Sequence, residues 1–441
     1  MTDKFIKFIN NENLADKSGS LLLGVSGGVD SMVMMELFLE TGFNISVAHC
    51  NFGLRGSESN DDELFVAKQA ETNRIPFHSK SFDTFNYSDE RGISIQMAAR
   101  ELRYSWFDTL MVENGYSAVA IAHNKNDIAE TFMVNILRGT GIRGLTGIKA
   151  KTGNIIRPLL FAERKEIVEY AIKNNVSHRE DSSNSDIKYK RNRIRHRIIP
   201  EFENISGGFI NSLYQTTCRL NDVETIYSDA INNKFNELWI RNRKEFRVEI
   251  KALLKLDPLP SYLYEFLRIW GFPRELIARI IKSLEATPGK QFYSATHRLV
   301  KDRSHLIVTP KTAEGITRHY IEEGAGELSE PVSLRISKIK NSSVFRIPAD
   351  PKVACLDLSN IHFPLMLRKW QKGDYFQPLG MNGMKKLSDF FIDNKFSIVE
   401  KENTWLLMSG NRLAWIIGRR IDDRFKITDR TKEILMIELL D

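Results

Sequence analysis

The short stretch SGGVDS, residues 26–31, combines small, hydroxyl-bearing and acidic side chains in a pattern that suits phosphate binding. It follows the aliphatic run 21–25 and precedes helix-forming residues, which predicts a turn between a strand and a helix. The first turn of a helix binds anions through free N–H groups and its dipole, and glycine lets phosphate oxygens approach the backbone. We therefore expect phosphate contacts from Ser26, Gly27, Gly28, Val29, Asp30 and Ser31.

Asp30 is the unexpected member of this turn, because a carboxylate repels a bound phosphate unless a cation lies between them or the carboxylate caps the turn. Mg²⁺ would remove the repulsion, so Asp30 is the residue that we expect to bind a magnesium ion. The turn lacks the lysine of GxxxxGK[ST] and does not fit GxGxxG, which disfavours a phosphoryl-transferring P-loop and a dinucleotide fold. An ordinary glycine-containing turn is the alternative, and the two serines and the aspartate argue against it.

A second acidic pair, Asp127 and Glu130, has the spacing of one helix face. Two carboxylates at this spacing can reach one ligand, so they could hold an ammonium group, or one could take its proton. The competing interpretation is a solvated helix face. His123 precedes this helix at the end of a predicted strand, where packing competes with a functional role.

Arg100 and Arg103 share a predicted helix face with Gln96. An arginine there could stabilise negative charge on a phosphate during a reaction. A surface salt bridge is an equally good interpretation for either residue taken alone. Arg55 has the same ambiguity.

Two basic regions are candidates for nucleic-acid contacts. The segment 187–197 has six Lys or Arg residues and no acid, unlike an ordinary solvated charge run, so contact with backbone phosphates is favoured. Around 368–386, basic and aromatic residues alternate, which suits either RNA binding or a small β-domain core with a basic rim. The candidate residues are Lys188, Lys190, Arg191, Arg193, Arg195, Arg197, Arg368, Lys385 and Lys386.

The elements that must position these residues alternate between strand and helix patterns. This alternation predicts an α/β fold with a doubly wound parallel sheet, in which ligands bind beyond the carboxyl ends of the strands. The predicted strands are 21–25, 45–49, 76–81, 118–123 and 155–160. The predicted helices are 30–39, 61–73, 94–112, 127–137 and 162–174.

The rest of the chain predicts further domains. A length of 441 residues with 42% hydrophobic composition is too much for one ordinary domain. We predict a nucleotide-binding catalytic domain at 1–205, a mainly helical domain at 206–320, and a small mixed or β-rich C-terminal domain at 321–441. The last two are expected to recognise nucleic acid, with which the net charge of +7 is compatible.

Composition and the N-terminus exclude several classes of protein. Three widely spaced cysteines without a CxxC pair disfavour a zinc ribbon, a disulfide framework and a cysteine-ligated iron–sulfur cluster. The N-terminal residues contain no apolar run that resembles a signal peptide or a membrane span. We therefore expect a cytoplasmic protein that does not bind membranes.

The motif SGGVDS resembles the SGGxDS signature of the PP-loop ATP pyrophosphatases, which split ATP between its α- and β-phosphates. Four further stretches, in order, resemble the tRNA(Ile)-lysidine synthetases of that superfamily, and a fifth, 367–391, resembles their small terminal domain. Phe52 departs from the pattern, because the family commonly has a second histidine there. The four stretches are HCNFGLRGSESNDDE, QMAARELRY, IAHNKNDIAETFMVNILRGTGIRGL and EDSSNSDIKYKRNRIRHRIIP.

This resemblance implies a two-step reaction. ATP, with Mg²⁺, would adenylate the carbon-2 oxygen of the wobble cytidine in an isoleucine tRNA with a CAU anticodon. The ε-amine of free L-lysine would then displace AMP and form lysidine. The resemblance adds His49, Asn51 and Arg55 to the ATP-binding residues. The implied catalytic residues are Asp30, Arg100, Arg103, His123, Asp127 and Glu130.

Two other functions fit part of the sequence. A PP-loop enzyme that thiolates tRNA would use cysteines to deliver sulfur or hold a cluster, and paired cysteines are absent. A non-catalytic RNA-binding homologue would look similar, although the retained acidic residues Asp30, Asp127 and Glu130 argue for turnover. The sequence does not determine the oligomeric state, and a homodimer is compatible with it.

Overall fold

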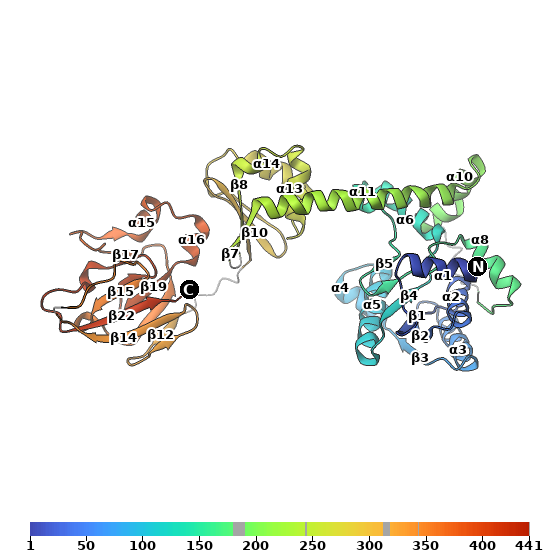
Figure 1. Cartoon of the computed structure of the whole chain (residues 1–441), viewed down its shortest axis with the longest axis horizontal. Coiled ribbons are helices and arrows are strands. Elements are labelled where there is room, and N and C mark those ends of the chain that lie inside the picture. The colour runs from blue at the N-terminus through green and yellow to red at the C-terminus, as the bar shows by residue number, and fades with distance from the viewer. Residues whose placement is uncertain (180–189, 243–244, 312–317, 343, 441) are drawn as a thin grey trace. The chain divides into compact units, whose positions relative to one another are not determined.

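The computed structural model describes residues 1–179, 190–242, 245–311, 318–342 and 344–440 (Figure 1). They form two compact units, Met1–Ser228 and Asp229–Asp441, each of which is described by itself. The division into three domains near residues 205 and 320 stays a prediction. No helix in the described part of the chain is both long and apolar enough to cross a membrane.

The first unit is built on a six-stranded sheet with the order β3-β2-β1-β4-β6-β5. All neighbouring strands are parallel except β5 and β6, which confirms the predicted parallel sheet. The connections reverse direction at β1, between β2 and β4, and such a switch point is where ligands bind in this class of fold. The strands are β1 (Ser20–Gly24), β2 (Asn44–Asn51), β3 (Phe77–Ser81), β4 (Ala118–Ile121), β5 (Lys151–Thr152) and β6 (Ile155–Ile156).

Helices surround this sheet, and each predicted helix is present with shifted ends (Figure 1). The predicted strand 155–160 is shorter than expected, because β6 stops two residues before Pro158, which lacks a backbone donor. The sheet and α2 share a core that includes Leu21, Leu23 and Phe38. The helices are α1 (Thr2–Asn11), α2 (Val29–Glu40), α3 (Ser57–Thr72), α4 (Thr84–Arg91), α5 (Ile95–Asn114), α6 (Lys125–Arg138), α7 (Ile142–Leu145) and α8 (Arg164–Lys173).

A run of helical segments follows the sheet. It comprises α9 (Lys190–Arg193), a π-helical segment (Ile194–Ile198), α10 (Ile199–Ile205) and the long α11 (Phe209–Leu238). Ile194 and Ile199 pack with Ala129 of α6, so this basic segment has an apolar side that faces α6. This packing positions the arginines of the segment.

After the end of α11, the second unit contains a five-stranded antiparallel sheet of order β7-β8-β11-β10-β9. The predicted hairpin at 297–308 is confirmed by β10 and β11, while β7, β8 and β9 extend it beyond what the sequence predicted. The strands are β7 (Trp239–Asn242), β8 (Glu245–Glu249), β9 (Gln291–Tyr293), β10 (His297–Lys301) and β11 (His305–Pro310). The helices are α12 (Ile250–Leu253), α13 (Leu259–Arg268) and α14 (Ile277–Ser283).

The C-terminal part is β-rich, as predicted. A five-stranded sheet, β12-β16-β19-β20-β21, and a four-stranded sheet, β13-β14-β22-β15, share a core around Leu367, Trp415 and Ile437. The strands are β12 (His319–Ile321), β13 (Glu327–Leu328), β14 (Leu334–Lys340), β15 (Val353–Asp357), β16 (Leu365–Lys369), β17 (Tyr375–Phe376), β18 (Lys385–Lys386), β19 (Trp405–Ser409), β20 (Arg412–Ile416), β21 (Arg420–Ile421) and β22 (Glu433–Leu439). The helices are α15 (Leu387–Asp393) and α16 (Ile398–Asn403).

Candidate active site

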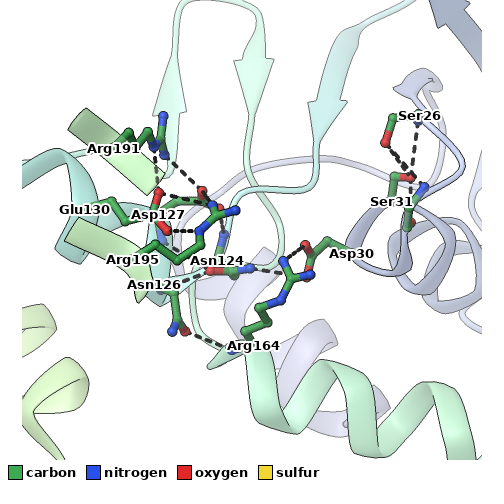
Figure 2. Close-up of polar contacts among 11 residues, drawn as sticks. Ser26, Asp30, Ser31, Asn124, Asn126, Asp127, Glu130, Arg164, Arg191 and Arg195 are labelled. Carbon is green, nitrogen blue, oxygen red and sulfur yellow. Dashed lines mark hydrogen bonds and ion pairs between the residues drawn. The ribbon is translucent and has the colours of Figure 1, made fainter. Parts of the chain in front are cut away.

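The turn between β1 and α2 is closed by its own two serines. The Ser31 hydroxyl donates to the Gly28 carbonyl oxygen at 2.9 Å and accepts the Ser26 amide at 3.2 Å (Figure 2). Gly27 adopts a φ of +91°, a conformation that favours glycine. Gly28 is the N-cap of α2, so Val29 and Asp30 lie in the first helical turn, where amides are free to bind an anion.

Asp30 connects this turn to two other elements of the site (Figure 2). Its carboxylate accepts one hydrogen bond from Arg164 Nη1 at 2.9 Å and another from Asn124 Nδ2 at 3.2 Å. Burial raises the pKa of Asp30, and Arg164 opposes that shift. Neither Arg164 nor Asn124 was predicted as a site residue, and Arg164 offers no local signal because it lies at the start of α8, 134 residues away.

Asn124 caps helix α6 and fixes the position of Asp127. The Asn124 side-chain oxygen accepts the Asp127 amide at 3.2 Å, while the Asp127 carboxylate accepts the Asn124 amide at 3.0 Å. This capping box is visible in the sequence as N-x-x-D ahead of a helical pattern, so Asn124 could have been predicted. The neighbouring Asn126 side-chain oxygen accepts the Arg164 amide at 2.9 Å, which joins α6 to α8.

The acidic pair meets two arginines of the basic segment (Figure 2). Glu130 is fully buried, and its carboxylate accepts Arg191 Nε at 2.6 Å and Arg195 Nε at 2.5 Å. Asp127 accepts Arg191 Nη2 at 3.0 Å. The interpretation of Asp127 and Glu130 as a solvated face is therefore wrong for this part of α6. The sequence predicted phosphate contacts for Arg191 and Arg195 because their segment has no acid; α6 supplies the acids in the folded chain.

His123 lies next to this group at the end of β4. Its Nδ1 accepts a hydrogen bond from Arg157 Nε at 3.2 Å. Burial lowers the pKa of His123 to about 4, and the positive charge of Arg157 acts in the same direction. His123 is therefore neutral near pH 7. Arg157 was not predicted, because it follows β6, and only the pairing of β6 with β4 brings it close to His123.

The predicted residues at the end of β2 are held by local contacts. His49 is buried, and its Nδ1 lies 2.9 Å from the Val25 carbonyl oxygen, to which a protonated Nδ1 donates. Burial lowers the pKa of His49. Asn51 donates to Glu63 at 2.9 Å, and Arg55 pairs with Asp62 at 2.7 Å. The ends of β1, β2 and β4 thus bring predicted residues to one edge of the sheet.

Arg100 and Arg103 lie on α5 and contact aromatic rings. The Arg100 guanidinium lies 4.8 Å from the centroid of the Tyr104 ring, and that of Arg103 lies 5.2 Å from the centroid of Phe52. Phe52, where the sequence departs from the family pattern, thus supports a predicted catalytic arginine through a cation–π contact. The phosphate role of both arginines stays a prediction.

The remaining predicted tRNA-binding residues have different surroundings. Arg193, Arg197 and Lys386 are exposed, and Lys385 pairs with Asp393 at 2.5 Å. Arg368 is buried and forms two hydrogen bonds to Asp374, at 2.7 and 2.8 Å, so its predicted contact with tRNA does not fit this position. Its guanidinium instead stabilises the loop after β16. Lys188 and the side chain of Lys190 lie outside the described residues.

Family models match three parts of the chain in order. A PP-loop domain matches residues 1–202, a TilS substrate binding domain matches 241–311, and a TilS substrate C-terminal domain matches 365–438.

Similar proteins match along nearly the whole chain. A tRNA(Ile)-lysidine synthase from Parabacteroides distasonis is 39% identical, covering 98% of both chains. One from Bacteroides thetaiotaomicron is 39% identical over 99% of both. One from Clostridium tetani is 31% identical over 100% of this chain and 98% of its own.

Proposed function

The chain belongs to the tRNA(Ile)-lysidine synthase family, and from this premise we propose how its residues divide the formation of lysidine. The enzyme uses ATP to modify the wobble cytidine of isoleucine tRNA. The observation that carries this function is the 39% sequence identity to a lysidine synthase over 98% of the chain, together with the three family models that match in order.

The turn after β1 is the proposed site for the pyrophosphate end of ATP. The amides of its first helical turn and its small residues can bind two phosphates. The Asp30 carboxylate joins the turn to α6 and α8 through hydrogen bonds from Asn124 and Arg164. Among the residues described, no three His, Cys, Asp or Glu side chains gather into a metal site. One carboxylate with substrate phosphates and water is a common set for Mg²⁺, so Asp30 is the residue that would hold the ion, which would neutralise phosphate charge.

Free L-lysine is the proposed nucleophile, with its ε-amine directed by the acidic pair on α6. Glu130 is fully buried under two guanidinium groups, which suits a positioning role. Asp127 retains 14% side-chain exposure, and its partner Arg191 retains 45%, so lysine could reach Asp127 once Arg191 moves aside. We propose Asp127 as the contact for the lysine amine, and Glu130 as the residue that holds the arginines.

The neighbouring residues complete this assignment. Neutral His123 suits a hydrogen-bonding role beside the reacting groups, and Arg100 and Arg103 are proposed to stabilise the α-phosphate. Exposed Arg193, Arg197 and Lys386 are proposed to contact tRNA phosphates. We place the reaction in the cytoplasm, and a homodimer stays a prediction.

Thiolation gains no support from the cysteines. The side chains of Cys50, Cys218 and Cys355 are free thiols. Burial raises the pKa of Cys50 to about 12, so at neutral pH this residue near the site is a thiol and not the thiolate that sulfur chemistry uses.

The test is incorporation of radiolabelled lysine into two unmodified CAU-anticodon tRNAs, those for isoleucine and initiator methionine. We expect label only in the isoleucine tRNA and only with ATP. Absence of label in both, from folded protein that binds ATP and tRNA, would refute lysidine formation, and sulfur and ammonia would then be tested as nucleophiles.

Asp30→Ala is expected to abolish AMP release. The change removes the carboxylate that joins the ATP turn to Arg164 and Asn124 while leaving the exposed basic residues in place. AMP release and tRNA binding by filter retention measure the two effects separately. Normal turnover, or loss of tRNA binding, would show that the role assigned to Asp30 is wrong.

A further inference from the structure

Arg157 is a buried arginine that the proposed mechanism does not use. Only 6% of the residue is exposed. Its Nη1 donates to the Lys149 carbonyl oxygen at 2.7 Å and to the Thr152 hydroxyl at 3.2 Å. Its amide donates to the Ala150 carbonyl oxygen at 2.9 Å. The guanidinium is therefore fixed by β5 and by the residues just before it, independently of the site.

The contact between Arg157 and His123 determines where the imidazole carries its proton. Arg157 Nε lies 3.2 Å from His123 Nδ1. Every nitrogen of a guanidinium is a donor and none is an acceptor, so Nδ1 must accept with its lone pair. A neutral imidazole whose Nδ1 is unprotonated carries its proton on Nε2. The contact thus selects one of the two neutral tautomers.

Nε2 is the atom through which His123 can contact a ligand. Within the described ranges, no residue forms a hydrogen bond with this nitrogen, and His123 is not fully buried. Nε2–H is therefore an unused donor among the groups to which we assign the α-phosphate and the lysine amine. The charged side chains near enough to shift the pKa of His123 are Asp127 of α6, Arg157, Arg191 of α9 and Arg103 of α5.

We propose that Arg157 is a positioning residue that holds His123 in the tautomer with its proton on Nε2, so that His123 donates a hydrogen bond to an oxygen of the α-phosphate. The same tautomer leaves His123 no free lone pair, so it does not take the proton of the lysine amine. This inference rests on the proposed function, and it leaves Asp127 as the acceptor of that proton.

A neutral donor suits the charges around His123. Burial lowers its pKa to about 4, Asp127 opposes the shift, and the positive charges of Arg157, Arg191 and Arg103 add to it. An imidazolium would place a further positive charge beside three guanidinium groups. A neutral N–H avoids this repulsion and still gives a phosphate oxygen a donor of fixed direction.

The first experiment determines the tautomer in the full-length protein, with its histidines labelled with nitrogen-15. Proton–nitrogen correlation spectra distinguish both neutral tautomers and the imidazolium, and His123→Gln identifies the signal of His123 by its loss. At neutral pH the wild type should carry the proton on Nε2. Arg157→Met removes the donors and the charge, so both tautomers should appear and the proton affinity should rise about tenfold. A wild-type proton on Nδ1 overturns the proposal, even if Arg157→Met does not fold.

Two further variants control for the loss of a buried arginine. Arg157→Lys keeps a cationic donor and should recover part of the wild-type tautomer. Arg368→Met is the same change at a buried arginine of the second unit, where Arg368 bonds to Asp374, and it should leave the His123 signal unchanged. Identical His123 spectra in Arg157→Met and the wild type refute the positioning role.

Kinetics separate this role from a general loss of structure. Arg157→Met should lower kcat about tenfold, as expected when one hydrogen bond in the transition state is weakened. The KM for lysine should not change, because the capping box still holds Asp127. A higher KM for lysine with an unchanged kcat overturns the proposal, because it would place His123 at the amine.

Binding of AMP and of adenosine tests the phosphate contact without lysidine formation. AMP carries the α-phosphate and should shift the Nε2 signal of the wild type, whereas adenosine should not. An unchanged Nε2 signal at saturating AMP refutes the contact. A wild type with the proton on Nε2 and a shift on AMP binding, but without lysidine formation, refutes the proposed function alone.

Discussion

Two acids one turn apart on α6 have different surroundings. Glu130 is completely buried and bonded to Arg191 and Arg195, whereas Asp127 completes the capping box with Asn124 and keeps some exposure. A group that touches substrate must be reachable, while a group that positions others is best buried and fully hydrogen-bonded. This difference in burial is the basis for assigning lysine contact to Asp127 and positioning to Glu130.

His123 gives a pH dependence of stability with a definite sign. The pKa of His123 in the folded chain, about 4, lies below its ordinary value of 6.5. At a pH between these two values, the unfolded chain therefore binds a proton that the folded chain does not bind. The contribution of His123 to the free energy of unfolding is fully present above about pH 6.5 and is lost as the pH falls toward 4. Because the side chain is partly exposed, we expect a loss of about 1 kcal/mol between pH 7 and 5.

Urea unfolding of the first unit, followed at pH 7 and pH 5, measures this loss. His123→Gln keeps a hydrogen-bond acceptor for Arg157 but cannot take up the proton. The difference between the two pH values should therefore be smaller by about 1 kcal/mol in this variant. An identical pH dependence in the variant and the wild type would show that His123 does not titrate in this range.

The basic segment illustrates how one short element serves two purposes. Arg191 and Arg195 are four residues apart and face the acids of α6, while Ile194 packs in the apolar core beside them. Arg193 and Arg197 are exposed. The helical period thus separates the arginines of the site from those that can meet a phosphate backbone.

Two matched variants test this separation. Arg193→Gln should weaken tRNA binding uniformly and reduce the slope of log K against log salt by about 1, as expected for one lost phosphate contact. Arg195→Gln should leave that slope unchanged and lower lysidine formation. It should also lower the free energy of unfolding by about 3 kcal/mol, because Glu130 loses a buried partner. Filter binding at several salt concentrations and urea unfolding measure both effects.

The reverse pattern would contradict this assignment. If Arg195→Gln changes the salt slope as much as Arg193→Gln does, Arg195 contacts tRNA, and its pairing with Glu130 is not its main role. Lys4→Gln is a suitable control, because Lys4 forms an exposed ion pair with Glu166 on the first unit.

At the scale of the whole molecule, two units have separate hydrophobic cores. One core joins the parallel sheet and α2, and another joins the two C-terminal sheets. All the residues proposed to bind ATP lie in Met1–Ser228. A ligand that binds one folded unit stabilises that unit, so the two units should respond differently to ATP.

Differential scanning calorimetry with a non-hydrolysable ATP analogue tests this expectation. At about 100 times its dissociation constant, the analogue should add about 2.7 kcal/mol to the stability of the first unit. The transition of Asp229–Asp441 should not move. A single transition that shifts as a whole would show that the two units unfold together.

The sequence by itself determined the local features of this protein. The parallel strands β1 to β4 and β6, the helices α2, α3, α5, α6 and α8, the turn at residues 26–31, the acidic pair on α6 and the basic segment are visible in it. These features depend on hydrophobic period, glycine and capping preferences over a few neighbouring residues. The meeting of β1, β2 and β4 at one edge also followed from the rule for parallel sheets.

Only the tertiary structure decided which charged groups pair. Arg191 and Arg195 are 61 and 65 residues from Glu130, and Arg164 is 134 residues from Asp30. A run of arginines without nearby acids looks free in the sequence, because local patterns carry no information about acids supplied by another helix. Ion pairs of this kind depend on how packed elements bring distant residues together, and that packing pairs two arginines that were predicted to contact phosphates with the acids of α6.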